Sequence, residues 1–381
     1  MSERQQGSGR RAMRWCVFAA LFLCASSLAT ACPLCLGAFR SSVAQQLVNL
    51  PHEVLAQPSA DGRGYRVVAV IKGEKPAGGM IPEEEVELDV VPDANATLLL
   101  ARDEAWSMWV AFGAVAVEHA GWLRQIAAGK HLSDMNADEW RAQLALILPY
   151  LEDREPLVAE IAYGELAAAP YAALLAAKPR LAAPAIRRWL ADPRLAARQS
   201  LYLLLLGIAG DAGDAAALEV RLEALSMAGD ATNLGSMIAA DLQLRGPQRM
   251  AWVDAKYMAN RLRSTRELEA ALLALSVLGN ENDAIPRDRV IQSYRLFMQE
   301  HKELAGFVAW DLAAWQYWGA VPVYLALNKS NVRQDFKSRV AISAYLQQSP
   351  VRGLFDAGAS EVDARDQQTS AQRSAISALP Q

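Results

Sequence analysis

The sequence predicts a mixed, mainly α fold, in which a small N-terminal β-barrel or sandwich precedes an α-solenoid. Three observations lead to this prediction. Short apolar segments separated by turn residues fill the region before residue 128, apolar residues recur at helical spacing from about Ser133 onward, and the helical part shows self-similarity. The chain of 381 residues is long enough for about two domains.

Residues 1–31 have the parts of a secretory signal peptide. Four arginines precede an apolar run from Trp15 to Cys24, and small residues lead to Ala29-Thr30-Ala31, which is typical of a cleavage site. The apolar run is shorter than the ~20 residues that a membrane span needs, and no other stretch approaches that length, although a retained N-terminal anchor is the alternative. We therefore expect an exported protein of the periplasm or cell envelope, or a secreted one.

A C-x-x-C motif, Cys32-Pro33-Leu34-Cys35, directly follows this site. Cys16 and Cys24 would leave with the signal peptide, so the mature chain would keep two cysteines. Three interpretations stay open: a local disulfide, a redox or soft-metal dithiol acting through Cys32 and Cys35, and a lipid anchor on Cys32. The four histidines (His52, His119, His131 and His301) have no metal-ligand spacing, so we expect no cofactor and no other metal site.

Composition limits the class of partner. The chain is 52% hydrophobic and 21% charged, as in a globular protein, and its net charge is −4. Cleavage after Ala31 would leave 34 basic and 41 acidic residues, a net charge of −7. An acidic chain without basic runs argues against a nucleic-acid partner.

Residues 32–128 carry the signals of a β-domain. A short helix is expected over Gly37–Leu47, before several short strands bounded by turn-forming residues. Several short strands with turns between them indicate a small OB-like barrel or sandwich. The expected strands are Tyr65–Ile71, Val86–Val91, Thr97–Ala101 and Trp109–Gly113.

Residues 133–350 predict helical repeats. Ser133 or Asp134 can cap a helix whose apolar face holds Trp140, Leu144 and Ile147, and a second helix is expected over Pro156–Ala169. Asp153 and Asp192 open comparable segments, and further helix pairs are expected near Asp230, Thr265 and Asp283. A period of about 40 residues with two helices each is typical of HEAT-like units, which stack into a solenoid, and the alternative is an irregular helical bundle without repeat symmetry. The tail over 356–381 lacks apolar periodicity and is expected to be disordered.

An aromatic cluster near the end of the helical region is the candidate partner surface. Trp310 and Tyr317 are seven residues apart and are expected to share a helix face. Such a cluster is either repeat core or a hot spot for a peptide or glycan. Its members are Trp310, Trp315, Tyr317 and Trp318.

The order of these features resembles a group of exported bacterial proteins with an N-terminal CPxC motif and a helical-repeat body. The resemblance rests on the signal peptide, the C-P-x-C motif, the Val67–Gly73 and Leu98–Arg102 segments and the helices that follow. The N-terminal part also looks distantly like the OB-fold of tissue inhibitors of metalloproteinases. There too a mature N-terminal cysteine precedes a barrel with an apolar strand that ends in basic residues, here Val67–Ile71 and Lys72. Those inhibitors carry C-x-C and many disulfides, whereas this chain has C-x-x-C and no further cysteine after it.

These features favour an exported, non-enzymatic scaffold whose helical body binds a protein partner. Solenoids function through extended surfaces, and the chain has no G-x-S-x-G, P-loop, G-x-G-x-x-G or H-E-x-x-H motif, although an enzymatic activity is left open. The first alternative is a thiol–disulfide or metal-handling protein that acts through Cys32 and Cys35. The second, which the resemblance implies, is a secreted metalloprotease inhibitor in which the amine and carbonyl of Cys32 chelate the enzyme's zinc.

Overall fold

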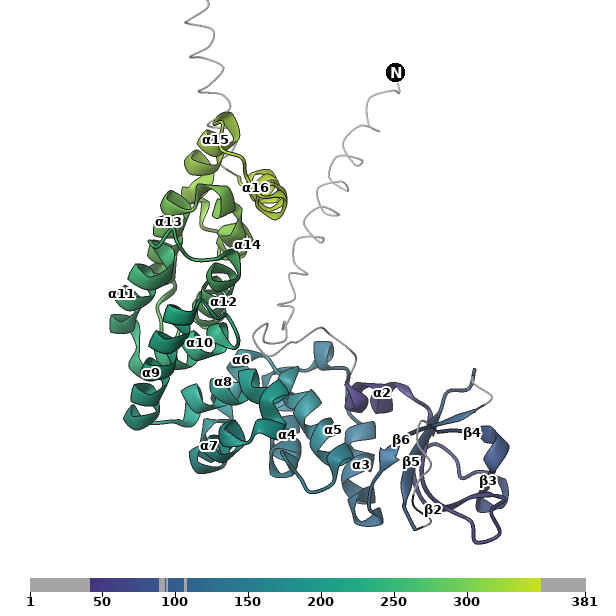
Figure 1. Ribbon diagram of the computed structural model, residues 1–381. Helices are drawn as coiled ribbons and strands as arrows, with labels where there is room; N and C mark the ends of the chain where they lie inside the picture. The colour runs from purple at the N-terminus through teal and green to yellow at the C-terminus, as the bar shows by residue number, and fades with distance from the viewer. Residues whose placement is uncertain (1–41, 89–92, 94, 106–107, 351–381) are drawn as a thin grey trace, which may run out of the picture. The chain divides into compact units, whose positions relative to one another are not determined.

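The computed structural model describes residues 42–88, 93, 95–105 and 108–350. The predicted signal peptide (1–31), Cys32, Cys35 and the predicted tail (356–381) lie outside these residues. The chain divides between Ala173 and Leu174 into two compact units. We call them the N-terminal unit (residues 42–173) and the C-terminal unit (residues 174–350); Figure 1 labels their helices and strands.

The N-terminal unit contains one six-stranded sheet with the order β3-β2-β1-β5-β6-β4. Neighbouring strands are antiparallel except β4 and β6, which pair in parallel at Val86 and Trp109. The strands are β1 (His52–Pro58), β2 (Gly64–Lys72), β3 (Met80–Pro82), β4 (Val86–Glu87), β5 (Leu98–Arg102) and β6 (Trp109–Ala114).

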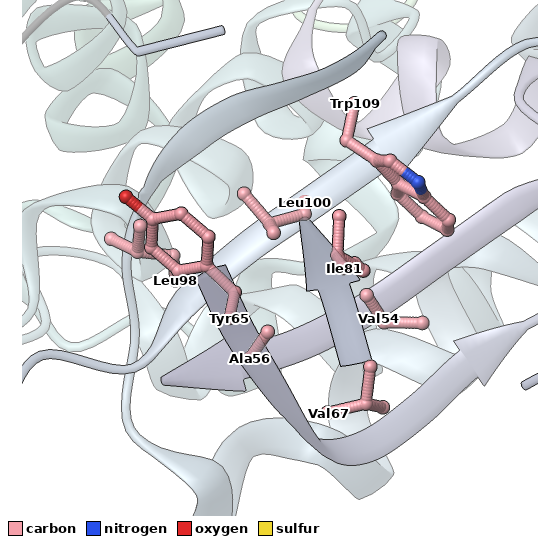
Figure 2. Packing of buried hydrophobic residues seen from close by; sticks show 8 residues of the cluster. All are labelled: Val54, Ala56, Tyr65, Val67, Ile81, Leu98, Leu100 and Trp109. Atoms are coloured by element: carbon pink, nitrogen blue, oxygen red, sulfur yellow. The ribbon is translucent and has the colours of Figure 1, made fainter. Parts of the chain in front are cut away.

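One face of this sheet encloses an apolar interior. Side chains from five strands meet there, from Ile81 on the edge strand β3 to Trp109 on β6 (Figure 2). Val86 of β4 packs against the same cluster, so the sheet curls around a single interior. The buried members are Val54, Ala56, Tyr65, Val67, Ile81, Leu98, Leu100 and Trp109.

The opposite face of the central strand β1 carries a buried acid. Successive side chains of a strand point to opposite faces, so Glu53 and Leu55 lie opposite Val54 and Ala56. Glu53 is fully buried, and neither of its carboxyl oxygens has a hydrogen-bond partner among the residues that the structure describes. Burial raises the pKa of Glu53 to about 8, although the charge of Lys72, its cross-strand neighbour, lowers it. Lys72 itself donates to two carbonyl oxygens at the end of helix α2 (Val43–Asn49), at 3.2 and 2.7 Å.

Four further helices of this region follow the sheet, and a buried polar network ties two of them to α2. Ser42 caps α2 and donates to Glu165 at 3.1 Å, while Gln143 donates to the other oxygen of Glu165 at 2.8 Å. Burial raises the pKa of Glu165, and the hydrogen bonds from Gln143, Ser42 and Gln45 lower it. The helices are α3 (Ala120–Ala127), α4 (Ala137–Ile147), α5 (Pro156–Ala167) and α6 (Tyr171–Ala176), which crosses the boundary between the units.

The C-terminal unit is built from helices whose ends carry strong local signals. Ser264 and Glu267 form a capping box at the start of α12, and Asn282 ends that helix with a left-handed φ of 54°. The α-helices are α7 (Ala183–Ala191), α8 (Gln199–Ala209), α9 (Ala212–Ala228), α10 (Leu234–Arg245), α11 (Met250–Val253), α12 (Thr265–Glu281), α13 (Arg287–Glu300), α14 (Ala309–Ala314), α15 (Val321–Lys329) and α16 (Phe336–Gln348). A π-helical turn, η9 (Asp254–Met258), follows α11, and a 3₁₀ segment, η10 (Lys302–Val308), precedes α14.

These helices pack in two rows within the unit. The first row contains α8, α10 and α12, with α10 between the other two (Figure 1). The second row contains α7, α9, η9 and α13; α7 packs on α8, and α9 packs on α10. The first row is close-packed, because a Cβ at Gly207 would lie 2.6 Å from the Cα of Ala240. Ion pairs link consecutive members of the second row: α7 to α9, α9 to η9, and η9 to α13. They are Arg187–Asp214 at 2.7 Å, Lys256–Glu223 at 2.8 Å and Arg289–Asp254 at 2.5 Å.

The coarse fold prediction is confirmed: the protein is mainly helical, with a small N-terminal six-stranded sheet followed by many helices. Three of the predicted strands match β2, β5 and β6, whereas only Val86–Glu87 of the predicted 86–91 strand is a described strand. Strands β1 and β3 were not predicted. The predicted helix that holds Trp140 is α4, and its cap is Asn136, not Ser133 or Asp134, because the Asn136 side chain and Glu139 form the capping box. Among the helices that the structure describes, none combines the length and the apolar composition needed to cross a membrane.

Candidate functional site

Only one member of the predicted aromatic cluster presents a largely exposed side chain. Trp310, on α14, is 53% exposed, whereas Trp315, Tyr317 and Trp318 are partly covered by neighbouring residues. The expectation that Trp310 and Tyr317 share a helix face is wrong. Helix α14 ends at Ala314, and Gln316 takes a left-handed φ of 55°, which turns the chain out of the helix before Tyr317.

Trp315 is a packing residue. Its ring stacks on Tyr294 with 5.6 Å between centroids and an interplanar angle of 9°. Its indole N–H donates to the side-chain oxygen of Asn280 at 2.7 Å, and a Cβ at Gly279 would lie 2.7 Å from the ring. The ring therefore fills the space between α12, α13 and α14.

Tyr317 and Trp318 hold the turn that follows α14. The hydroxyl of Tyr345, on α16, donates to the backbone carbonyl of Tyr317 at 2.5 Å. The Trp318 ring lies 5.2 Å from the ring of the same Tyr345. Both contacts secure α16 against the preceding helices.

A pocket of about 550 Å³ lies beside Trp310, between α12, the η10–α14 segment and α16. Its walls are mainly apolar, and two of the residues on α16 are largely exposed: Phe336 at 69% and Val340 at 48%. The volume and the apolar lining are typical of sites that bind a small molecule or a side chain of a partner. The lining residues are Glu269, Leu272, Leu273, Ser276, Gly306, Phe307, Trp310, Asp311, Phe336, Lys337, Val340 and Ala341.

The pocket exists because α16 docks closely on η10. The backbone N–H of Gly306 donates to the hydroxyl of Ser338 at 2.6 Å, in a buried contact. A Cβ at Gly306 would lie 2.6 Å from the Cα of Ser338, so only glycine allows this approach. The close contact at Gly306 therefore fixes how near α16 approaches η10 beside the pocket.

The carboxyl group of Asp311 lines this mainly apolar space, and so does that of Glu269. Asp311 accepts hydrogen bonds from Ser276 at 2.9 Å and from Tyr294 at 2.6 Å, one on each oxygen. Burial raises the pKa of Asp311, and the two hydrogen bonds lower it. Tyr294 is completely buried, and burial together with the charge of Asp311 raises its pKa well above the ordinary value.

At the mouth of the pocket Lys337 and Glu269 form an ion pair with 3.3 Å between Nζ and Oε1. Both side chains are largely exposed, so the pair contributes at most about 1 kcal/mol to stability. It can open for a ligand at little cost.

Of the exposed apolar residues of the pocket, Trp310 was predicted from the sequence, whereas Phe336 and Val340 were not. Phe336 and Val340 are spaced i, i+4 on α16, and a shallower hollow continues along the same helix past Ala344. Helix α16 thus has a buried apolar face that includes Ile342 and Leu346 and a second, exposed pair of apolar residues. Such a second apolar face can be recognised in the sequence and indicates a binding surface. A second signal of a binding site is Asp311, an acidic residue inside the apolar run around Trp310.

The C-x-x-C motif lies outside the described residues, so a disulfide, a dithiol or a lipid anchor at Cys32 and Cys35 stays a prediction. Within the described ranges, no group of three or more His, Cys, Asp and Glu side chains is arranged to hold a metal ion. No family model, no curated protein and no solved structure matches the chain.

Proposed function

We propose that this protein is an exported, non-enzymatic scaffold whose helical body binds a protein partner through the pocket between α12, α14 and α16. One observation carries the proposal: apolar side chains, among them the exposed Trp310, Phe336 and Val340, surround a hollow of about 550 Å³. Contiguous exposed apolar surface is unfavourable in water unless a partner covers it. Aromatic residues in a pocket are the usual anchors of such interfaces.

The packing of the C-terminal unit supports a HEAT-like solenoid as the form of this scaffold. Helices α8, α10 and α12 lie in one row, and ion pairs connect α7, α9, η9 and α13 in the other. In a solenoid each repeat contacts its neighbours, and the stack offers extended surface to a partner. The curled sheet of the N-terminal unit, with Ile81 and Trp109 in one cluster, supports an OB-like, partly closed barrel.

Export to the periplasm or cell envelope is part of the proposal. Its support is the arginine-rich, apolar and small-residue order of residues 1–31, followed by the C-P-x-C motif. The partner would then also lie outside the cytoplasm, and it would bind a chain whose full-length net charge is −4.

The test is site-specific photocrosslinking in the cells that make the protein. A crosslinking amino acid replaces Val340 in the pocket, and the matched control carries it at Val220, an exposed apolar residue of α9 that does not line the pocket. We expect a distinct crosslinked protein from position 340 and none, or a different set, from position 220.

The identified protein is then purified and its affinity is measured directly. Trp310→Ala and Phe336→Ala should each weaken binding by about tenfold or more, as expected for interface anchors. Leu262→Ala, at a position 94% exposed and outside the pocket, should leave the affinity unchanged. Equal affinities for all three variants would rule out the pocket as the binding site.

A further inference from the structure

The carboxyl group of Asp311 has no cationic partner among the residues that the structure describes. Its two contacts are hydroxyl groups, from Ser276 and Tyr294. A carboxylate has about four acceptor positions, so two uncharged donors leave it with unused capacity. Buried carboxylates are normally paired with a cation, because the loss of hydration is otherwise uncompensated.

Asp311 is partly buried, whereas Asp214, Asp241 and Glu267 of the same unit are buried, and these three show the normal arrangement. Asp241 lies 2.9 Å from Arg245 and 2.6 Å from Arg249, and Glu267 lies 2.9 Å from Arg263. Asp214 receives two hydrogen bonds of 2.7 Å from Arg187. Asp311 differs from them in one more respect: it lines an open pocket, where a ligand could supply the missing charge.

The basic groups near the pocket are engaged elsewhere. Lys337 pairs with Glu269 at the mouth, and Arg339 lies over the ring of Phe336 at 5.8 Å, along the shallower hollow. Arg287, which contacts the Trp315 ring at 5.4 Å, donates to the carbonyl oxygens of Gly279 and Asn280. The negative charge inside the pocket is thus left without a counter-charge from these three residues.

The walls specify the rest of the ligand. Leu272, Leu273 and Phe307 offer apolar contact, and Trp310 and Phe336 add aromatic faces that attract cations as well as apolar groups. A side chain with only a charge would leave these walls uncovered, and one with only an apolar body would bury Asp311 further.

We propose that the pocket recognises a peptide segment of its partner in which an apolar side chain lies next to a lysine or arginine. The apolar side chain packs between Trp310 and Phe336, and the cation reaches the carboxylate of Asp311. This inference rests on the proposed function, because it names the chemistry of the partner at the same site.

The test uses three capped pentapeptides that share one phenylalanine and carry lysine, glutamine or glutamate two positions after it. Binding to the mature chain is measured by NMR titration. We expect the lysine peptide to bind about five- to tenfold more tightly than the glutamine peptide, and the glutamate peptide to bind most weakly. The Asp311→Asn variant, which keeps the size of the side chain, should bind the lysine and glutamine peptides equally.

Glu269→Gln is the matched control, because it removes a carboxylate at the exposed mouth instead of the one inside. It should keep most of the preference for lysine. Equal binding of the three peptides by the unaltered protein, no binding of any of them, or a preference that survives Asp311→Asn would each overturn the inference. The comparison on the unaltered protein is decisive even if Asp311→Asn fails to fold.

The two proposals can fail separately. A crosslinked partner whose affinity falls with Trp310→Ala and Phe336→Ala but is unaffected by Asp311→Asn would overturn the charge inference alone. A partner whose affinity is unchanged by all three substitutions would overturn both the charge inference and the proposed binding site.

Discussion

The two compact units bury acidic side chains in different ways. In the N-terminal unit Glu53 lies on a central strand without a hydrogen-bond partner among the described residues, and Glu165 is held by uncharged side chains. In the C-terminal unit Asp214, Asp241 and Glu267 each contact an arginine from a nearby helix or turn.

The difference follows from the geometry of the two folds. Long arginine side chains on one helix can reach the neighbouring helix, and their apolar stems pack on the way. A strand in the middle of a sheet projects its side chain straight into the layer that covers it, so a partner must already be there. The units should therefore respond differently to pH and to loss of a carboxyl group.

The largest expected effect is the pH dependence that Glu53 imposes on the N-terminal unit. Its pKa is raised from 4.5 to about 8 in the folded state. Between these values the unfolded chain loses the proton while the folded chain keeps it, so the contribution of Glu53 to stability is greatest below pH 4.5 and falls as pH rises to 8. The slope is about 1.4 kcal/mol per pH unit, or about 5 kcal/mol over the whole window.

This dependence is measured by urea unfolding together with hydrogen exchange of the amides of β1 and β2 at several pH values. Glu53→Met should remove the slope and stabilise the unit at pH 8, because it replaces an uncompensated polar group by an apolar one. Glu87→Gln, at an exposed position of the same sheet, should leave the slope in place. An unchanged slope in Glu53→Met would show that another group is responsible.

The next effect is the cost of breaking an ion pair in the C-terminal unit. Asp241 is 2% exposed and contacts both Arg245 and Arg249. Asp241→Asn should destabilise the unit by about 2–3 kcal/mol, because Arg245 and the largely buried Arg249 then keep, among the described residues, only Glu219, which is 40% exposed, as a carboxylate partner. Glu300→Gln, at a pair whose Arg261 is 70% exposed, should cost less than about 1 kcal/mol in the same urea titration. Similar losses in both variants would contradict the role of burial.

A smaller effect is expected at the contact that forms the pocket. Gly306→Ala places a methyl group against the backbone of Ser338, and the strain should cost about 1–3 kcal/mol and weaken peptide binding. Gly121→Ala is the control, because a Cβ at this position of α3 meets no atom within 4 Å. It should stabilise its helix by about 0.5–1 kcal/mol. Thermal unfolding of the two variants should thus shift in opposite directions.

The smallest effect on stability is expected at the exposed wall of the pocket. Phe336→Ala should change the free energy of unfolding by less than about 1 kcal/mol, since the ring is already 69% exposed. Tyr345→Phe, which loses the buried contact to the Tyr317 carbonyl, is the comparison on the same helix and should cost about 1 kcal/mol or more. A loss above about 2 kcal/mol for Phe336→Ala would mean that this ring belongs to the core.

Much of the fold could be predicted because its signals are local. The alternation in β2 and the short apolar run of β5 mark strands, and Ser264 with Glu267 marks the start of α12. Strand β1 escaped prediction because its apolar run, Val54 to Ala56, is short and is flanked by Glu53 and Gln57. Strands are recognised in a sequence by apolar residues at buried positions, and Glu53 is an acidic residue at such a position.

The site was predicted only in part. The sequence pointed to the aromatic cluster, and Trp310 does line the pocket, while Trp315 stacks inside on Tyr294. Nothing in the local pattern separates the two, because both belong to one apolar run. Phe336 and Val340 were missed because they belong to a different helix.

By itself the sequence determined that short strands precede many helices, where β2, β5 and β6 lie, and the acidic character of the chain, since each depends on residues close together or on composition. Only the tertiary structure decided that Trp310 of the aromatic cluster is largely exposed, that Glu53 is buried without a hydrogen-bond partner among the described residues, and that Asp311 lines a pocket. The physical reason is that exposure and pairing are set by contacts between segments far apart in the chain. Gly306 and Ser338 are 32 residues apart, yet their buried contact holds α16 against η10 beside the pocket.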